Sequence, residues 1–185
     1  MWMYVAKGVK GIFHWQYHTE MIGTEAPNCG LLKPDSTPRQ AYHVMNRVYG
    51  EIERHKEVLE KSQAPQTRVA ILFSPESYLV YWNLETNSDR ARACLTGTYV
   101  ALYKYVDAID ILHPKDIGEK DLNRGRLIFL PYPLMLTRRV SRCLARFVEH
   151  GGFLVTEACC AMRDDRTDYQ RIVPGDGLDK MFGCR

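Results

Sequence analysis

Strand-like and helix-like segments alternate through the second half of the chain, and this alternation limits the fold more than any other feature of the sequence. Four short apolar runs are typical of buried strands: 69–73, 109–112, 127–130 and 153–156. Two amphipathic stretches between them are typical of helices: 90–105 and 138–150. Strands that are separated by helices pair in parallel and are covered on both faces. We therefore expect a parallel α/β sheet with helices on both faces.

The predicted helix 138–150 has clear start and stop signals. Thr137 precedes it and can accept a hydrogen bond from a free amide of the first turn. Gly151 follows it and can adopt the left-handed backbone conformation that ends many helices. The strands before and after this helix are therefore expected to lie side by side, joined by a right-handed crossover.

The first part of the chain has a different pattern and ends at a polar segment around Pro65. Thr37, Pro38 and Arg39 open a predicted helix, because apolar residues then recur at three- and four-residue steps: Ala41, Val44, Met45, Val48 and Ile52. We expect this helix to pack on an earlier strand, the apolar and aromatic run at 9–17. That run leads into a polar turn with acidic residues, as barrel strands do when they deliver site residues at their C-terminal ends.

Composition excludes several classes of protein. The formal charge is +3 and the basic residues are scattered, so nucleic acid is not an expected partner. No apolar run approaches the roughly 18 residues of a membrane span, and the start of the chain does not resemble a secretory signal. We therefore expect no membrane partner and a cytoplasmic location. The six cysteines have neither disulfide-framework nor zinc spacing, which favours reduced thiols and no bound metal.

Other candidate sites have simpler structural interpretations. Adjacent Cys159 and Cys160 are interpreted as buried thiols, because no basic partner occurs at a defined spacing. The acidic group Asp164, Asp165 and Asp168 fits no calcium loop and is interpreted as a solvated loop. His113 is interpreted as a strand-end residue. Since no glycine-rich phosphate loop follows a strand, no nucleotide cofactor is expected.

Segments in both parts of the chain resemble glycoside hydrolase family 42, the β-galactosidases. Residues 8–17, 23–25 and 30–31 are similar to the last barrel strand of that family and the loop after it. Residues 68–77 are similar to the opening strand of the family's second domain, and residues 147–155 to a later helix and strand of that domain. These segments occur in the family's order and span nearly the whole chain.

The resemblance implies a parent enzyme with three domains. These are a TIM barrel, an α/β domain related to class I glutamine amidotransferases and used for trimerisation, and a small β domain. Residues 1–62 would be the end of the (β/α)8 barrel, with its last strand, loop and helix. Residues 67–185 would be most of the amidotransferase-like, flavodoxin-like parallel domain. A homotrimer is therefore expected for the parent.

The resemblance also implies a retaining glycosidase that removes terminal β-galactose. Such an enzyme needs a carboxylic acid and a carboxylate nucleophile about 5 to 5.5 Å apart. In the family both glutamates belong to earlier barrel strands, and no residue before Glu20 in this chain is acidic. We therefore expect no catalytic residue here, and no hydrolysis of glycosides by this chain alone.

Sugar-binding residues are implied in the loop after the predicted barrel strand. Glu25 matches a family glutamate that binds hydroxyls of the terminal galactose, and a carboxylate can accept from two hydroxyls at once. Tyr17 and Trp15 could stack on a sugar face, although strand aromatics more often belong to the core. His18 and Asn28 stand where the family often has arginine and histidine. The resemblance therefore indicates glycoside hydrolysis as the reaction class more strongly than it indicates galactose as the sugar. The simple alternative for Glu25 is a solvated loop residue.

A second hypothesis gives the α/β half an independent role in assembly or ligand binding. In an active amidotransferase a cysteine occupies the sharp turn after a strand, but the turn at 131–134 has no thiol. Amidotransferase chemistry is therefore not expected. We also expect the segment 5–17 to be poorly ordered or to aggregate, because a barrel strand without neighbours leaves its backbone amides unpaired.

Overall fold

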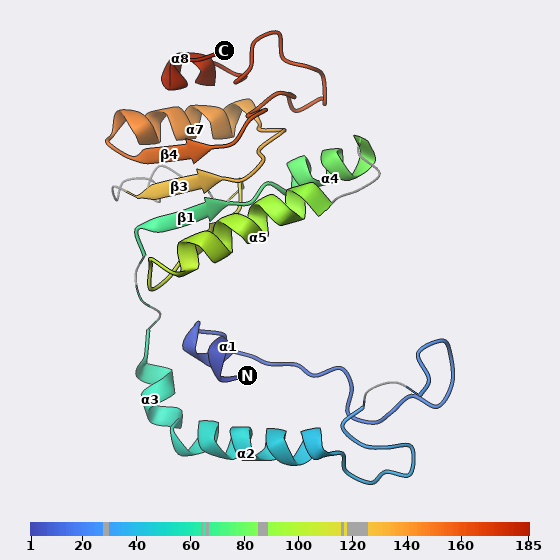
Figure 1. Ribbon diagram of the computed structural model, residues 1–185. Helices are drawn as coiled ribbons and strands as arrows, with labels where there is room; N and C mark the ends of the chain where they lie inside the picture. The colour runs from blue at the N-terminus through green and yellow to red at the C-terminus, as the bar shows by residue number, and fades with distance from the viewer. Residues whose placement is uncertain (28–29, 64, 66, 85–88, 116, 118–125) are drawn as a thin grey trace. The chain divides into compact units, whose positions relative to one another are not determined.

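The computed structural model divides the chain into two compact units, Met1–Ala64 and Pro65–Arg185. It describes residues 1–27, 30–63, 65, 67–84, 89–115, 117 and 126–185. Figure 1 shows the two units.

A four-stranded parallel sheet forms the centre of the second unit. Its strands are β1 (Val69–Leu72), β2 (Asp110–Leu112), β3 (Leu127–Leu130) and β4 (Phe153–Thr156), in the order β2-β1-β3-β4. Every neighbouring pair is parallel. The four predicted strands and their parallel pairing are thus confirmed. Their predicted burial holds for the central strands β1 and β3 but is wrong for β4, where Phe153 and Val155 are exposed at the edge of the sheet.

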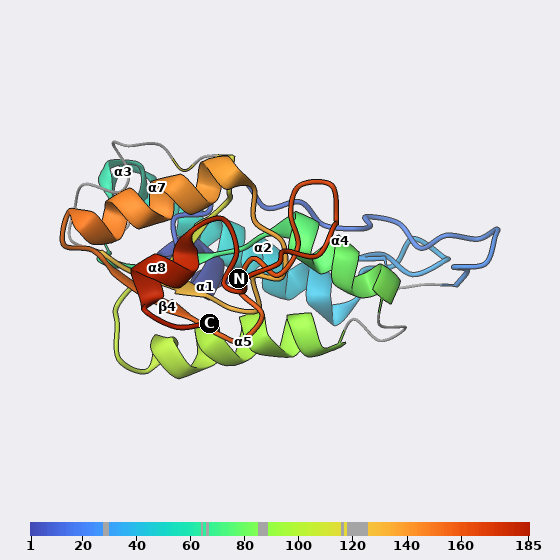
Figure 2. The ribbon, with the colours of Figure 1, turned by 90° about the horizontal axis from the view of Figure 1, so that it is seen from above.

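Two long helices lie on opposite faces of this sheet. α5 (Asp89–Tyr103) precedes β2, and α7 (Arg138–Glu149) connects β3 to β4. In Figure 2 these helices lie on opposite sides of β4. The connection from β1 to β2 runs toward one edge of the sheet, and the connection from β3 to β4 runs toward the other. Because both crossovers have the same hand, their helices lie on opposite faces.

The core of the unit lies between the sheet and α7. Ile128 and Leu130 of β3 are buried there against Val140, Leu144 and Phe147 of α7. These three helix positions follow a spacing of four and three residues, which directs them to one face of the helix. Full burial of each side chain contributes about 1.5 to 3 kcal/mol, so this layer stabilises the unit.

The ends of α7 are formed as the sequence predicts. The Thr137 hydroxyl accepts a hydrogen bond of 3.4 Å from the Val140 amide. Gly151 has φ +86°, the left-handed conformation expected after the helix. Gly152 is required for a different reason: a Cβ at this position would lie 2.3 Å from the Phe147 ring.

The helices α4 (Pro75–Leu84) and α8 (Leu178–Phe182) were not predicted. The start of α4 nevertheless has clear signals in the sequence. The Ser74 hydroxyl accepts a hydrogen bond of 3.1 Å from the Ser77 amide, and Pro75 occupies the first helical position. α8 is short and packs its buried Leu178 against the core.

In its described residues the first unit has three helices: α1 (Trp2–Ala6), α2 (Gln40–Arg54) and α3 (Lys56–Lys61). α2 covers the predicted helix, but none of its residues is fully buried. The predicted strand at 9–17 is wrong, because these residues form no strand. A strand needs a neighbouring strand for its amides, and none lies beside residues 10–15 in the described part of the chain. α2 therefore has no strand on which to pack.

Replacing Gly152 by alanine should destabilise the second unit. The added Cβ cannot fit beside the Phe147 ring without moving α7 or β4, so we expect the free energy of unfolding to fall by about 1 to 3 kcal/mol. Gly97→Ala in α5 is the matched control, because nothing lies within 4 Å of its added Cβ. That control should raise the free energy by about 0.5 to 1 kcal/mol. Urea unfolding measures both, and equal effects would contradict the prediction.

Candidate functional sites

The described members of the predicted sugar-binding set lie on the surface of the first unit. Trp15 and Tyr17 are both exposed, and the edge of the Tyr17 ring contacts Tyr42 at 6.4 Å between centroids. Glu25 is exposed in a turn and makes no hydrogen bond or ion pair with described residues. Asn28 lies outside the described residues.

His18 is the predicted site residue with the most contacts. Its Nδ1 is 3.0 Å from the Thr19 carbonyl oxygen, and its Nε2 is 3.2 Å from the Ser36 hydroxyl. The structure thus fixes His18 through neighbouring loop residues. Trp15, Tyr17 and His18 follow one another along the chain, whereas the cavities described below are lined by other residues.

Two chain segments cross closely near the ends of the loop that carries Glu25. Thr19 is buried and its hydroxyl donates a hydrogen bond of 2.6 Å to the Leu32 carbonyl. Gly30 is also buried, and a Cβ there would lie 2.3 Å from the Thr19 backbone nitrogen. Only glycine fits this crossing without a backbone shift. No local sequence signal indicates this role of Gly30, since it depends on a contact with a residue eleven positions away.

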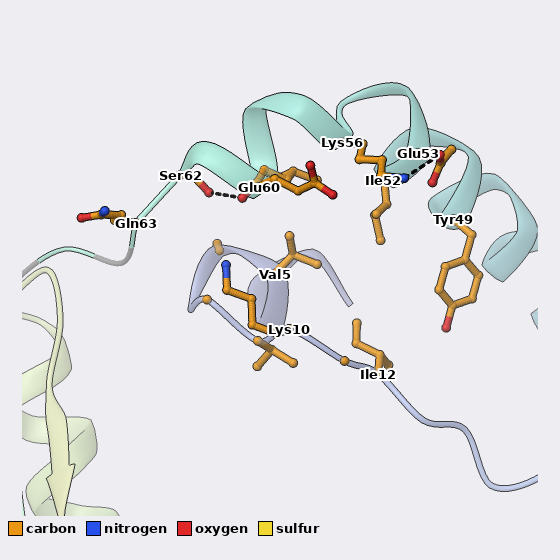
Figure 3. Close-up of a pocket in the computed structure, with 15 residues that line it drawn as sticks. Val5, Lys10, Ile12, Tyr49, Ile52, Glu53, Lys56, Glu60, Ser62 and Gln63 are labelled. Atoms are coloured by element: carbon orange, nitrogen blue, oxygen red, sulfur yellow. Dashed lines mark hydrogen bonds and ion pairs between the residues drawn. The ribbon is translucent and has the colours of Figure 1, made fainter.

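A largely apolar groove of about 520 Å³ lies in the first unit, between residues 5–12 and the helices α2 and α3. Figure 3 shows Val5, Ile12 and Ile52 among the residues that line it. Charged groups are also present, and Lys56 forms an ion pair of 3.5 Å with Glu53. The groove could hold apolar groups, and the Ser62 hydroxyl on its lining donates a hydrogen bond of 2.7 Å to the Leu59 carbonyl.

The turn after β3 lies at the C-terminal edge of the sheet, where many α/β proteins bind ligands. Tyr132 has φ +50°, and its amide donates a hydrogen bond of 3.2 Å to Glu157 Oε2. The Tyr132 ring meets the buried Tyr81 ring edge to face, at 4.6 Å between centroids and 89° between planes. Two packed phenol rings thus lie at this turn, and it carries no thiol.

The segment after β4 covers this turn. The Ala161 amide donates to the Pro133 carbonyl at 2.8 Å, and the Arg163 amide donates to the Leu134 carbonyl at 3.0 Å. These backbone hydrogen bonds hold the segment across the ends of the strands. The arrangement stabilises the turn and leaves its backbone polar groups engaged within the protein.

The five described cysteines, Cys94, Cys143, Cys159, Cys160 and Cys184, are all free thiols. Cys160 is fully buried as the sequence predicts, whereas Cys159 is only half-buried. Burial raises the pKa of Cys160 to about 11. Burial and a hydrogen bond to Glu157 raise the pKa of Cys94 to about 11. Both thiols are therefore protonated and poor nucleophiles near neutral pH.

The other candidate positions also have structural roles. Asp164 Oδ1 accepts hydrogen bonds of 2.9 Å from the Arg166 and Asp168 amides, which makes the acidic segment a compact turn. His113 follows β2, and its Nδ1 accepts a hydrogen bond of 3.0 Å from the Lys115 amide. In the described part of the chain, no group of three or more potential ligands is arranged to hold a metal. No helix there is long and apolar enough to span a membrane.

Raising the pH should destabilise the folded chain through Cys160. The unfolded thiol ionises near pH 9.0, whereas the folded thiol ionises near pH 11. Its stabilising contribution is therefore complete below pH 9 and is lost as the pH rises toward 11. Over this range the free energy of unfolding should fall by about 1.4 kcal/mol per pH unit.

Urea unfolding between pH 8 and pH 11 measures this dependence. Cys160→Ala should show a shallower decline than the natural chain, while Cys143→Ala, which removes a half-buried thiol of α7, should decline with the natural slope. Parallel curves for all three proteins would show that Cys160 does not carry the effect.

Comparisons with known proteins give the family of the second unit. Residues 67–185 match the family model described as the β-galactosidase trimerisation domain. No curated protein sequence matches the chain significantly. Among solved structures, a β-galactosidase from Bifidobacterium adolescentis is 26% identical with a TM-score of 0.56, over 65% of this chain and 55% of that one.

Two further solved structures are similar over nearly the whole chain. A GH42 β-galactosidase from G. stearothermophilus is 17% identical with a TM-score of 0.78, over 96% of this chain and 26% of that one. A β-galactosidase from the psychrophilic Marinomonas ef1 is 16% identical with a TM-score of 0.73, over 97% of this chain and 27% of that one. At these identities the likeness concerns the fold, and the chain spans about a quarter of their length. Because the family model covers well over half of the sequence, the chain belongs to the β-galactosidase trimerisation domain family of the GH42 glycosidases.

Proposed function

We propose that the chain acts as part of a retaining β-galactosidase, in which the second unit assembles subunits into a trimer. The match of residues 67–185 to the trimerisation domain carries this proposal. The solved β-galactosidases with a similar fold support it. The free thiols are compatible with the cytoplasm as the compartment, because disulfides are rare there.

The first unit would contribute sugar-binding groups to this enzyme. Glu25 is exposed and has no described partner, so both of its oxygens can accept hydrogen bonds from sugar hydroxyls. Trp15 and Tyr17 are exposed aromatic residues that can stack on a sugar ring. His18 and Asn28 complete the proposed set. The substrate would be a terminal β-galactoside.

The chain alone is proposed to be inactive. Hydrolysis with retention requires two carboxyl groups about 5 to 5.5 Å apart on either side of the bond. The resemblance assigns both of these glutamates to earlier barrel strands. The first unit, proposed to be the end of that barrel, would therefore bind sugar without cleaving it.

A second candidate function is assembly without any part in catalysis. The turn at Tyr132 favours it, because that position carries a packed phenol ring and the segment after β4 covers it. In this alternative the amidotransferase-like unit would serve oligomerisation alone. It predicts no sugar binding by residues of the first unit.

Galactose binding by the chain separates the two functions. We expect galactose to shift the amide resonance of Glu25 in a titration followed by NMR. Glu25→Gln should weaken binding about tenfold or more, because a charge-assisted hydrogen bond contributes about 1.5 to 3 kcal/mol. Glu20→Gln is the matched control on the same loop and should bind as the natural chain does.

A chromogenic galactoside tests the expected inactivity. The chain should give no turnover above buffer. Turnover that Glu25→Gln abolishes would contradict the proposed location of the catalytic pair, and absence of any galactose binding would favour the assembly function.

A further inference from the structure

The two faces of the sheet differ sharply in how they are covered. Strand register places Ile71, Phe129 and Val155 in one row across neighbouring strands, on the face of α5. Ala70, Ile128 and Leu154 form the adjacent row, which faces α7. The second row belongs to the buried core or packs against it. The first row lies outside that core cluster.

On the side of the sheet that carries α5, only the central strands are well covered. Ile71 of β1 is 0% exposed, but the row ends on β2 and β4 with Ile111 54% exposed and Val155 45% exposed. Phe153, two residues before Val155 and so on the same side of β4, is 69% exposed. Parallel sheets are normally buried on both faces. This face therefore presents apolar side chains where cover is expected.

Most of α5 carries no charge. Its charged residues are confined to its first turn, and residues 93–103 contain none. No residue of this helix is fully buried, and Val100 is 53% exposed. Beyond the first turn its outer side therefore combines apolar side chains with uncharged polar ones, and depletion of charge is typical of the centre of protein interfaces. The rings of Tyr99 and Tyr103 stack at 6.1 Å between centroids, which adds the aromatic surface typical of protein interfaces.

A groove of about 250 Å³ joins α5 to the open side of the sheet. It is lined by Thr98 and Leu102 of α5 and by Phe129, Val155 and Glu157. Ligand pockets usually enclose about 300 to 1,000 Å³, so this groove is small for a separate ligand. Because the groove continues onto the exposed surface of α5, it is better suited to be part of a flat, apolar protein interface.

We propose that the α5 face, defined by Val100, Tyr103, Phe153 and Val155, is the surface through which copies of this chain associate. The inference rests on the proposed assembly role of the second unit and specifies the surface that carries it. A second copy is the expected partner, because the matched family is a trimerisation domain. Association would bury the apolar side chains of β4 that α5 does not cover.

Sedimentation equilibrium on the full chain tests this surface. The natural chain should show a mass above its 21.4 kDa monomer and approach three times that value as concentration rises. Val100→Glu on α5 and Phe153→Glu on β4 each put a charge on the α5 face. Each should raise the dissociation constant about a hundredfold, as expected for residues that dominate an interface. Both residues are exposed in the single chain, so circular dichroism should remain unchanged.

Two controls make the result specific. Ile172→Glu adds the same charge at an exposed apolar residue of the same unit, outside the α5 face. Phe13→Glu does so in the exposed segment of the first unit. Both should associate as the natural chain does.

Each outcome then decides one point. A natural chain that stays monomeric at all concentrations overturns the proposed assembly role and this inference together. Association that survives Val100→Glu and Phe153→Glu, or that Phe13→Glu or Ile172→Glu abolishes, overturns the α5 face alone and leaves trimerisation standing.

Discussion

The packing of β3 against α7 is the interaction on which the rest of the second unit depends. Ile128 and Leu130 bury one face of the strand against Leu144 and Phe147, and the neighbouring strands are paired to β3 on both sides. This layer holds α8 and the segment after β4 as well, because their buried residues belong to the same cluster. The opposite face of the sheet contributes little to that cluster, so stability and self-association can reside on different sides of one sheet.

Much of this arrangement could be predicted from the sequence, because its signals are local. Apolar runs of four residues between amphipathic stretches indicated the parallel strands, and Thr137 and Gly151 marked the ends of α7. Ser74 and Pro75 are equally clear signals for the start of α4, although no helix was predicted there. The prediction failed at residues 9–17, which have the aromatic pattern of a strand, because no strand pairs with them in the described part of the chain. Pattern alone cannot supply the partner that a strand requires.

The candidate sites were less accessible to sequence reasoning, because they depend on contacts between distant segments. The close approach of Gly30 to Thr19 and the packing of Tyr81 on Tyr132 join residues that lie far apart in the sequence. The resemblance to a family assigned a role to Glu25, which the structure describes as an exposed loop residue. The sugar-binding role of Glu25 is thus a hypothesis based on the ability of a carboxylate to accept hydrogen bonds from hydroxyl groups. The other residues of a sugar subsite would have to come from outside this loop.

The turn at Tyr132 is closed by main chain. Its backbone has a positive φ, and the segment after β4 is hydrogen-bonded across it at Pro133 and Leu134. Exchanging the phenol for a thiol would place a reactive atom at the turn without opening a path for a substrate. An engineered active site here would therefore require a deletion or rerouting of main chain in addition to the substitution.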